Sequence, residues 1–121
     1  MVIDIINLEK RKIMSLFKKI TAEDAKKIMD SEEDYKIVDV RTLAEYKTGH
    51  IVGAICLPDE EIDEDSAKKN LPDKNQKLLI YCRSGIRSKD AAHKLVKLGY
   101  TNVIEFGGIL NWQYDIESNK E

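Results

Sequence analysis

One cysteine stands where a strand and a helix are expected to meet, a position suited to chemistry. Cys82 follows the apolar run 78–81, and the segment Arg83-Ser84-Gly85-Ile86-Arg87-Ser88 leads from it into an amphipathic stretch. A turn that contains glycine can curl around the sulfur, so that the unpaired N–H groups at the start of the helix point inward and hold an anion. The pattern therefore predicts a nucleophilic cysteine in an anion-binding loop.

The charges next to this cysteine favour the same interpretation. Arg83 and Arg87 bring two positive charges to the loop. Together with the N–H groups they predict that the pKa of Cys82 lies below the ordinary value of about 8.5. The structural alternative is a cysteine that fills space at a strand end. Two arginines within five residues do not suit an apolar core position, so the reactive interpretation is favoured.

The composition limits the classes of function. A chain of 121 residues fits one domain with its own core, and a net charge of −2 gives no field that would attract nucleic acid. The two cysteines, Cys56 and Cys82, lie outside any CxxC or Cys/His ligand spacing, so neither a disulfide framework nor a metal site is expected. Neither a signal peptide nor a membrane span is indicated. We therefore expect a cytoplasmic protein with reduced cysteines.

The strands and helices that position the cysteine are predicted from the sequence pattern. Apolar runs alternate with amphipathic stretches, which is typical of βα units around a parallel sheet. Strands are predicted at 17–20, 37–40, 54–57, 78–81 and 103–106. Helices are predicted after an N-cap at Thr21, around 43–46, over a stretch that buries 91–96 and ends at 98–99, and at 109–114 after a Gly107-Gly108 turn. Ligands bind beyond the carboxyl ends of such strands, which here carry Asp39/Arg41, Cys82 and Gly107/Gly108.

Three further features have a structural and a functional interpretation. The six acidic residues between Asp59 and Asp65 fit a solvated helix start, where they complement the helix dipole, better than a docking patch for a basic partner. Cys56 lies in a predicted strand, which favours burial over a role as a second, resolving thiol. His93 falls on the polar side of its helix and is expected at the surface, not as a ligand.

Several short groups of residues along the chain, taken together in their order and spacing, indicate a protein family. From about Phe17 to Tyr114 the chain resembles the single-domain rhodanese family of sulfurtransferases. The matching residues are Val38-Asp39-Val40-Arg41, Glu45-Tyr46, Gly49-His50-Ile51 with Gly53-Ala54, Tyr81 to Ser88, and Gly107-Gly108-Ile109 with Trp112. The resemblance implies an α/β fold with a central parallel five-stranded sheet and helices on both faces. We place this domain at 16–116, after an N-terminal extension at 1–15 and before a polar tail at 117–121.

The resemblance also implies roles for individual residues. Cys82 is the expected carrier of a transferable sulfur, held as a persulfide. The substrate-binding cradle is expected to consist of Arg83, Ser84, Gly85, Ile86, Arg87 and Ser88, with Arg87 closing it. Supporting positions are Asp39, Arg41, Glu45, His50, Gly107 and Gly108, and His50 is not expected to act as a base. Trp112 and Tyr114 are expected to pack beside the loop.

The implied reaction moves a sulfane sulfur from a small anionic donor, such as thiosulfate or a polysulfide, to a small-thiol or protein-thiol acceptor, with no metal or organic cofactor. Two alternatives stay open. One is a non-catalytic module that docks a partner or senses persulfide. The other is a cysteine phosphatase or arsenate reductase, whose loop needs one residue more than the four between Cys82 and Arg87.

Overall fold

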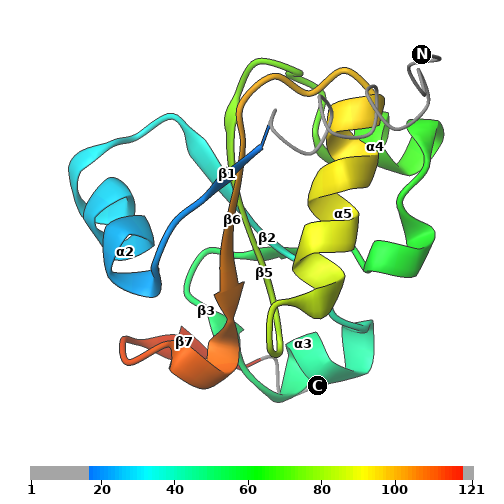
Figure 1. The fold of residues 1–121 in the computed structure, drawn as a ribbon. Helices are drawn as coiled ribbons and strands as arrows, with labels where there is room; N and C mark the ends of the chain where they lie inside the picture. The colour runs from blue at the N-terminus through cyan, green and yellow to red at the C-terminus, as the bar shows by residue number, and fades with distance from the viewer. Residues whose placement is uncertain (1–16, 119–121) are drawn as a thin grey trace, which may run out of the picture.

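The computed structural model describes residues 17–118, in which a five-stranded sheet carries helices on both faces (Figure 1). The strands are β1 (Lys18–Lys19), β2 (Tyr35–Asp39), β4 (Ile55–Cys56), β5 (Lys77–Cys82) and β6 (Val103–Gly108), in the order β1-β6-β5-β2-β4. All neighbouring strands of this sheet are parallel, which confirms the predicted fold class.

The helices are α2 (Ala22–Ser31), α3 (Leu43–Thr48), α4 (Glu64–Asn70) and α5 (Ile86–Lys97), with short 3₁₀ helices η1 (Asp59–Glu61) and η2 (Ile109–Asn111). Side chains cap the first turns of α2, α3 and α4, whereas α5 begins at Gly85 without a side-chain cap. Thr21 accepts the Asp24 N–H at 3.1 Å at the start of α2, as the sequence predicts. Thr42 and Glu45 form a capping box at the start of α3.

The sheet separates two hydrophobic cores, because successive residues of a strand point to opposite faces. Leu78, Ile80 and Cys82 pack on the face that α4 and α5 cover. Leu79 and Tyr81 pack on the face that α2 covers. Figure 1 shows α2 on one side of the sheet and α4 and α5 on the other. Cys82 is therefore the last residue of a strand that is fixed on both faces.

The predicted closing helix at 109–114 is wrong. Only Ile109–Asn111 forms a single 3₁₀ turn, and the chain then runs extended into β7 (Ile116–Glu117). The indole of Trp112 packs against Phe106 with 5.9 Å between ring centroids, and its N–H donates to the Asp115 carbonyl at 3.2 Å. These contacts hold the segment against the sheet in a form that a helix would not allow. Gly107-Gly108 is not a separate turn either, since both residues belong to β6.

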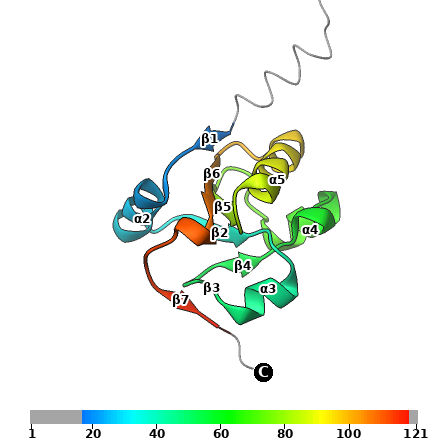
Figure 2. The ribbon, with the colours of Figure 1, turned by 60° about the horizontal axis from the view of Figure 1, so that its bottom comes forward.

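A second, two-stranded sheet pairs β7 antiparallel with β3 (His50–Ile51), as Figure 2 shows. The predicted tail at 117–121 therefore begins one residue too early, because Glu117 is a strand residue opposite His50. The predicted extension at 1–15 and the last residues of the tail, 119–121, lie outside the described residues.

The acidic segment begins a helix. Asp63 caps α4 by accepting the Ser66 N–H at 2.8 Å, and Glu64 and Asp65 lie in the first turn, where acids complement the helix dipole. This is the arrangement that the structural interpretation of the segment expects. Among the helices of residues 17–118, none has the length and apolar character that a bilayer crossing requires.

Candidate active site

Cys82 sits at the bottom of a tight loop between β5 and α5. Its side chain is buried, with 1% of the residue's surface exposed. The backbone N–H of Gly85 donates to Cys82 Sγ at 2.9 Å. Gly85 adopts φ +109 as the N-cap of α5, a left-handed conformation that glycine reaches without steric cost. The loop thus turns back on the sulfur, and it places a hydrogen-bond donor against it.

The other loop residues divide into an inner and an outer group. Ser88 is fully buried, and its Oγ lies 3.5 Å from Cys82 Sγ. Arg83, Ser84 and Ile86 point outward and are exposed. Ile86 exposes 79% of its surface, so its side chain does not line the buried sulfur.

Arg87 does not stand free at the mouth of the loop. Its guanidinium donates to both carboxylate oxygens of Glu45, at 2.7 and 3.0 Å. This pair ties α3 to the first turn of α5 across 42 residues of sequence. The Arg87 guanidinium, aided by hydrogen bonds from Thr42, lowers the pKa of Glu45 to about 2. Glu45 offsets much of the Arg87 charge, so the group that acts directly on the sulfur is the backbone N–H of Gly85.

Gly108, at the end of β6, lets the loop approach the sheet. The pairing register between β5 and β6 shifts here, from Ile80 opposite Glu105 to Cys82 opposite Gly108. A Cβ atom on Gly108 would lie 2.0 Å from the Arg83 carbonyl oxygen, a distance that real atoms never reach. Only glycine at this position leaves room for the loop that carries Cys82.

A buried carboxylate that the sequence reasoning missed lies directly behind the loop. Glu105 is 0% exposed, and its Oε1 accepts hydrogen bonds from the Ser88 hydroxyl and the Gly107 N–H, both at 2.7 Å. Within residues 17–118 its Oε2 is buried without a hydrogen-bond partner. The available signal was a charged residue inside the apolar run 103–106. Glu105 joins the first turn of α5 to the end of β6 and so fixes the loop from behind.

A polar cluster lies at the end of the neighbouring strand β2. Arg41 donates to the Asp39 carboxylate through Nε at 3.0 Å and Nη2 at 2.7 Å, and to the Gly49 carbonyl at 2.6 Å. The Tyr81 hydroxyl donates to Asp39 Oδ2 at 2.7 Å and accepts the Ile51 N–H at 3.0 Å. Burial, and then the Asp39 carboxylate, raise the pKa of Tyr81, so its hydroxyl stays a donor. The cluster braces the strand end, as the resemblance implies.

The contacts of His50 are structural. It is buried, with Nδ1 2.8 Å from the Tyr46 carbonyl and Nε2 3.1 Å from Glu117 Oε1. Its ring stacks on Tyr46 with 3.7 Å between centroids. His93, expected at the surface, is half-buried and packs against Phe17 at 5.2 Å.

The second cysteine points to the other face of the sheet. Cys56 pairs in register with Asp39, and Asp39 pairs with Tyr81, so these three side chains share a face. Cys82 follows Tyr81 and points to the opposite face. Burial, and then Asp39, raise the pKa of Cys56 to about 11, which keeps it a thiol near neutral pH. The described residues also contain no group of three or more side chains arranged to hold a metal ion.

Comparison with known proteins gives the same fold and family. The rhodanese-like domain family model matches residues 21–115. A solved rhodanese-like domain from Anabaena superposes with a TM-score of 0.76 at 28% identity, covering 83% of this chain and 78% of that one. A rhodanese-like domain protein from Staphylococcus aureus gives 0.69 at 30% identity, covering 85% and 99%.

Sulfur-handling proteins are among the relatives in sequence. A sulfurtransferase of Allochromatium vinosum is 37% identical over 94 residues, 77% of this chain and 85% of that protein. The thiosulfate sulfurtransferase of Escherichia coli is 39% identical over 72 residues, 60% of this chain and 68% of that protein. The chain spans about half of a putative sulfur carrier protein of Bacillus subtilis, 49%, at 35% identity. The match of the family model over most of the chain, together with these relatives, shows that the chain belongs to the rhodanese-like domain family.

Proposed function

We propose that this protein is a sulfurtransferase that carries sulfane sulfur as a persulfide on Cys82. Sulfur transfer in general has the support of the relatives named as sulfurtransferases. The observation that carries the assignment to Cys82 is the Gly85 N–H at 2.9 Å from its sulfur, which is itself buried. A donor fixed at this place stabilises negative charge on the sulfur without any rearrangement.

The proposed reaction takes place in two steps through a covalent intermediate. The Cys82 thiolate attacks the outer sulfur of thiosulfate, or a sulfur of a polysulfide. A bond forms between the two sulfur atoms, and the bond to the leaving group breaks. Sulfite, or a shortened polysulfide, leaves with the electron pair of that bond, and the persulfide keeps one negative charge. A thiophilic acceptor then takes the outer sulfur and restores the Cys82 thiolate.

The geometry favours this reaction over phosphoryl transfer. A phosphatase loop holds a tetrahedral oxyanion with an arginine that offers both N–H groups of its planar fork. Here Arg87 already donates both Nη groups to Glu45, and four residues separate it from Cys82. The loop is thus short for an oxyanion, and its arginine is occupied. A module that only docks a partner would not need the donor at the sulfur.

Intact-protein mass spectrometry after thiosulfate treatment tests the proposal. We expect reduced protein to gain the mass of one sulfur atom after excess donor is removed, and to lose it on adding cyanide as thiocyanate forms. Cys82→Ser should not gain sulfur, whereas the matched variant Cys56→Ser should gain it as the unmodified protein does. If folded, reduced protein gains no sulfur from thiosulfate or polysulfide, the proposal is wrong. Phosphate release from an aryl phosphate would then support the phosphatase alternative.

A further inference from the structure

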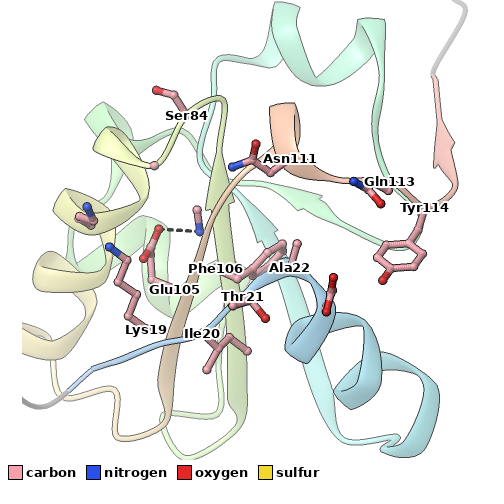
Figure 3. Close-up of a pocket in the computed structure, with 14 residues that line it drawn as sticks. Lys19, Ile20, Thr21, Ala22, Ser84, Glu105, Phe106, Asn111, Gln113 and Tyr114 are labelled. Carbon is pink, nitrogen blue, oxygen red and sulfur yellow. Dashed lines mark hydrogen bonds between the residues drawn. The ribbon is translucent and has the colours of Figure 1, made fainter.

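Glu105 is a buried carboxylate on the same face of the sheet as Cys82. It pairs in register with Ile80, which stands two residues before Cys82 on β5, so these side chains share the face that α5 covers. Figure 3 shows Glu105 on the side of β6 that faces α5, with its hydrogen bond from Gly107 as a dashed line. Glu105 is 0% exposed and Cys82 is 1% exposed, so both groups are closed to solvent.

One hydroxyl lies between the carboxylate and the sulfur. Ser88, in the first turn of α5, is also 0% exposed. Its Oγ lies 2.7 Å from Glu105 Oε1 and 3.5 Å from Cys82 Sγ. Its other two polar contacts are the carbonyl oxygens of Gly85 and Gly107, at 3.0 and 3.3 Å, and a carbonyl only accepts hydrogen bonds. A continuous chain of polar groups therefore runs from the sulfur to the carboxylate.

The hydroxyl of Ser88 carries one proton, which sets the direction of this chain. When Glu105 is ionised, the Ser88 hydroxyl donates to it, because a hydrogen bond to a charged acceptor is the stronger one. The Ser88 oxygen is then left to accept from the Cys82 S–H. When Glu105 is protonated, its O–H donates to Ser88, and the Ser88 hydroxyl is free to turn to the sulfur. The chain thus fits a thiol with a carboxylate, or a thiolate with a carboxylic acid.

Burial makes a second negative charge in this chain unfavourable, because an ion without a counter-charge is costly away from water. In the part of the chain that the structure describes, Glu105 Oε2 has no hydrogen-bond partner and Glu105 forms no ion pair. Of the nearby cations, Arg87 is held in an ion pair, and Lys19 and Lys89 are exposed to solvent. One negative charge shared by Cys82 and Glu105 therefore costs less than a charge on each.

We propose that Ser88 and Glu105 form a proton relay for Cys82, in which a proton reaches Glu105 as negative charge forms on the sulfur. The inference rests on the proposed persulfide. The S–H bond breaks and its electron pair stays on the sulfur. The thiol proton joins Ser88 Oγ, and the former Ser88 proton joins Glu105 Oε1. The thiolate then attacks thiosulfate, sulfite leaves as the dianion, and the persulfide keeps one charge, so no proton is exchanged with solvent.

Infrared difference spectroscopy tests the relay, because a carboxylic acid and a carboxylate absorb at different frequencies. Protein loaded with sulfur from thiosulfate is compared with unloaded protein near pH 8, where Asp59, whose pKa burial raises to about 6, is ionised in both states. We expect loading to add the carbonyl band of a protonated carboxyl group. Glu105→Gln should lack this band. Asp39→Asn, which removes the other fully buried carboxylate of the described residues, should keep it.

The rate of persulfide formation gives a second test. Ser88→Ala removes the middle of the relay, and we expect sulfur uptake near pH 7, followed by rapid quenching and intact mass, to slow by on the order of a hundredfold. Raising the pH should restore much of this loss, because hydroxide then removes the thiol proton directly, whereas a displaced loop would stay slow. Ser31→Ala, which removes an exposed hydroxyl at the end of α2, should load at the wild-type rate.

Failure of the relay differs from failure of the proposed function. If folded, reduced wild type gains no sulfur, the proposed function is wrong. Alkylation of Cys82 by iodoacetamide then judges the relay, since it needs the thiolate but no sulfur donor, and Ser88→Ala should again react more slowly. If persulfide forms without the protonated carboxyl band, or if Ser88→Ala reacts at the wild-type rate or stays slow at high pH, the relay is wrong and Glu105 only braces the loop.

Discussion

Two polar regions lie at the same edge of the sheet and differ in how completely their groups are paired. In the cluster of Asp39, Arg41 and Tyr81, one buried ion pair and several hydrogen bonds leave no buried side-chain nitrogen or oxygen without a partner. In the Cys82 loop, a backbone N–H points at a sulfur, and the Glu105 carboxylate keeps one unpaired oxygen.

The difference separates a structural network from the proposed reactive site. A fully satisfied buried network gains rigidity and has nothing left to offer a ligand. A network that keeps an unused donor or acceptor can bind a group of the opposite kind. In the Cys82 loop the Gly85 N–H is such a donor, and it can stabilise negative charge on the sulfur. The contrast yields predictions for stability in one region and for sulfur uptake in the other.

The largest expected effect on stability comes from breaking the satisfied cluster. Asp39→Asn keeps the shape of the side chain but leaves the Arg41 guanidinium buried without a counter-charge. We expect the free energy of unfolding, measured in urea, to fall by about 3 kcal/mol. The folded fraction should still take up sulfur at Cys82. Asp30→Asn, which breaks the exposed pair with Lys26, should leave the free energy of unfolding nearly unchanged, because solvent screens such a pair. A folded Asp39→Asn protein that no longer takes up sulfur would contradict the distinction between the two regions.

Gly108→Ala should instead damage the reactive site. The added methyl group would lie 2.0 Å from the Arg83 carbonyl, so the loop must shift. We expect a loss of about 2 kcal/mol in unfolding free energy and persulfide formation slower by about a hundredfold. Gly53→Ala is the control, because Gly53 has φ +85 but no atom within 4 Å of an added Cβ. It should cost about 1 kcal/mol and leave sulfur uptake unchanged. Uptake at the normal rate in Gly108→Ala would show that the loop position is not critical.

A smaller effect is expected from the half-exposed pair of Glu45 and Arg87, and it depends on pH. The pKa of Glu45 is lowered from 4.5 to about 2, so the pair stabilises the fold above about pH 4.5 and loses this contribution as the pH falls toward 2. Solvent screening limits the contribution to about 1 kcal/mol or less. Urea unfolding of wild type and Glu45→Gln should differ at pH 6 and converge near pH 2. A difference that stays constant with pH would mean that the pair contributes through packing alone.

The smallest effect is expected at Cys56. Its thiol lies on the face of the sheet opposite to Cys82 and has a pKa of about 11. Cys56→Ser should therefore load and discharge sulfur at rates close to those of the wild type. In Cys82→Ser, iodoacetamide should alkylate the remaining Cys56 slowly at pH 7.5. If Cys56→Ser takes up sulfur but cannot release it, Cys56 is a resolving thiol after all.

Local patterns in the sequence were sufficient for the parallel strands, the Thr21 cap and the Cys82 loop with its glycine. These features depend on neighbours within a few residues, since periodicity, capping and turn conformation are short-range properties. Prediction from local patterns was wrong at 107–114, where a Gly-Gly pair before an apolar stretch suggested a turn and a helix. Contacts of Trp112 with Phe106, and of β7 with β3, decided otherwise.

Tertiary structure alone decided which charged groups meet. The sequence determined that Cys82 ends a buried strand and begins a tight loop. It did not determine that Arg87 is paired with Glu45, 42 residues away, or that Glu105 lies behind Ser88. Pairing of this kind depends on how strands are ordered and helices packed, and no short-range pattern records it. The physical reason is that burial and charge compensation are properties of the whole fold, whereas a motif describes only its own stretch of chain.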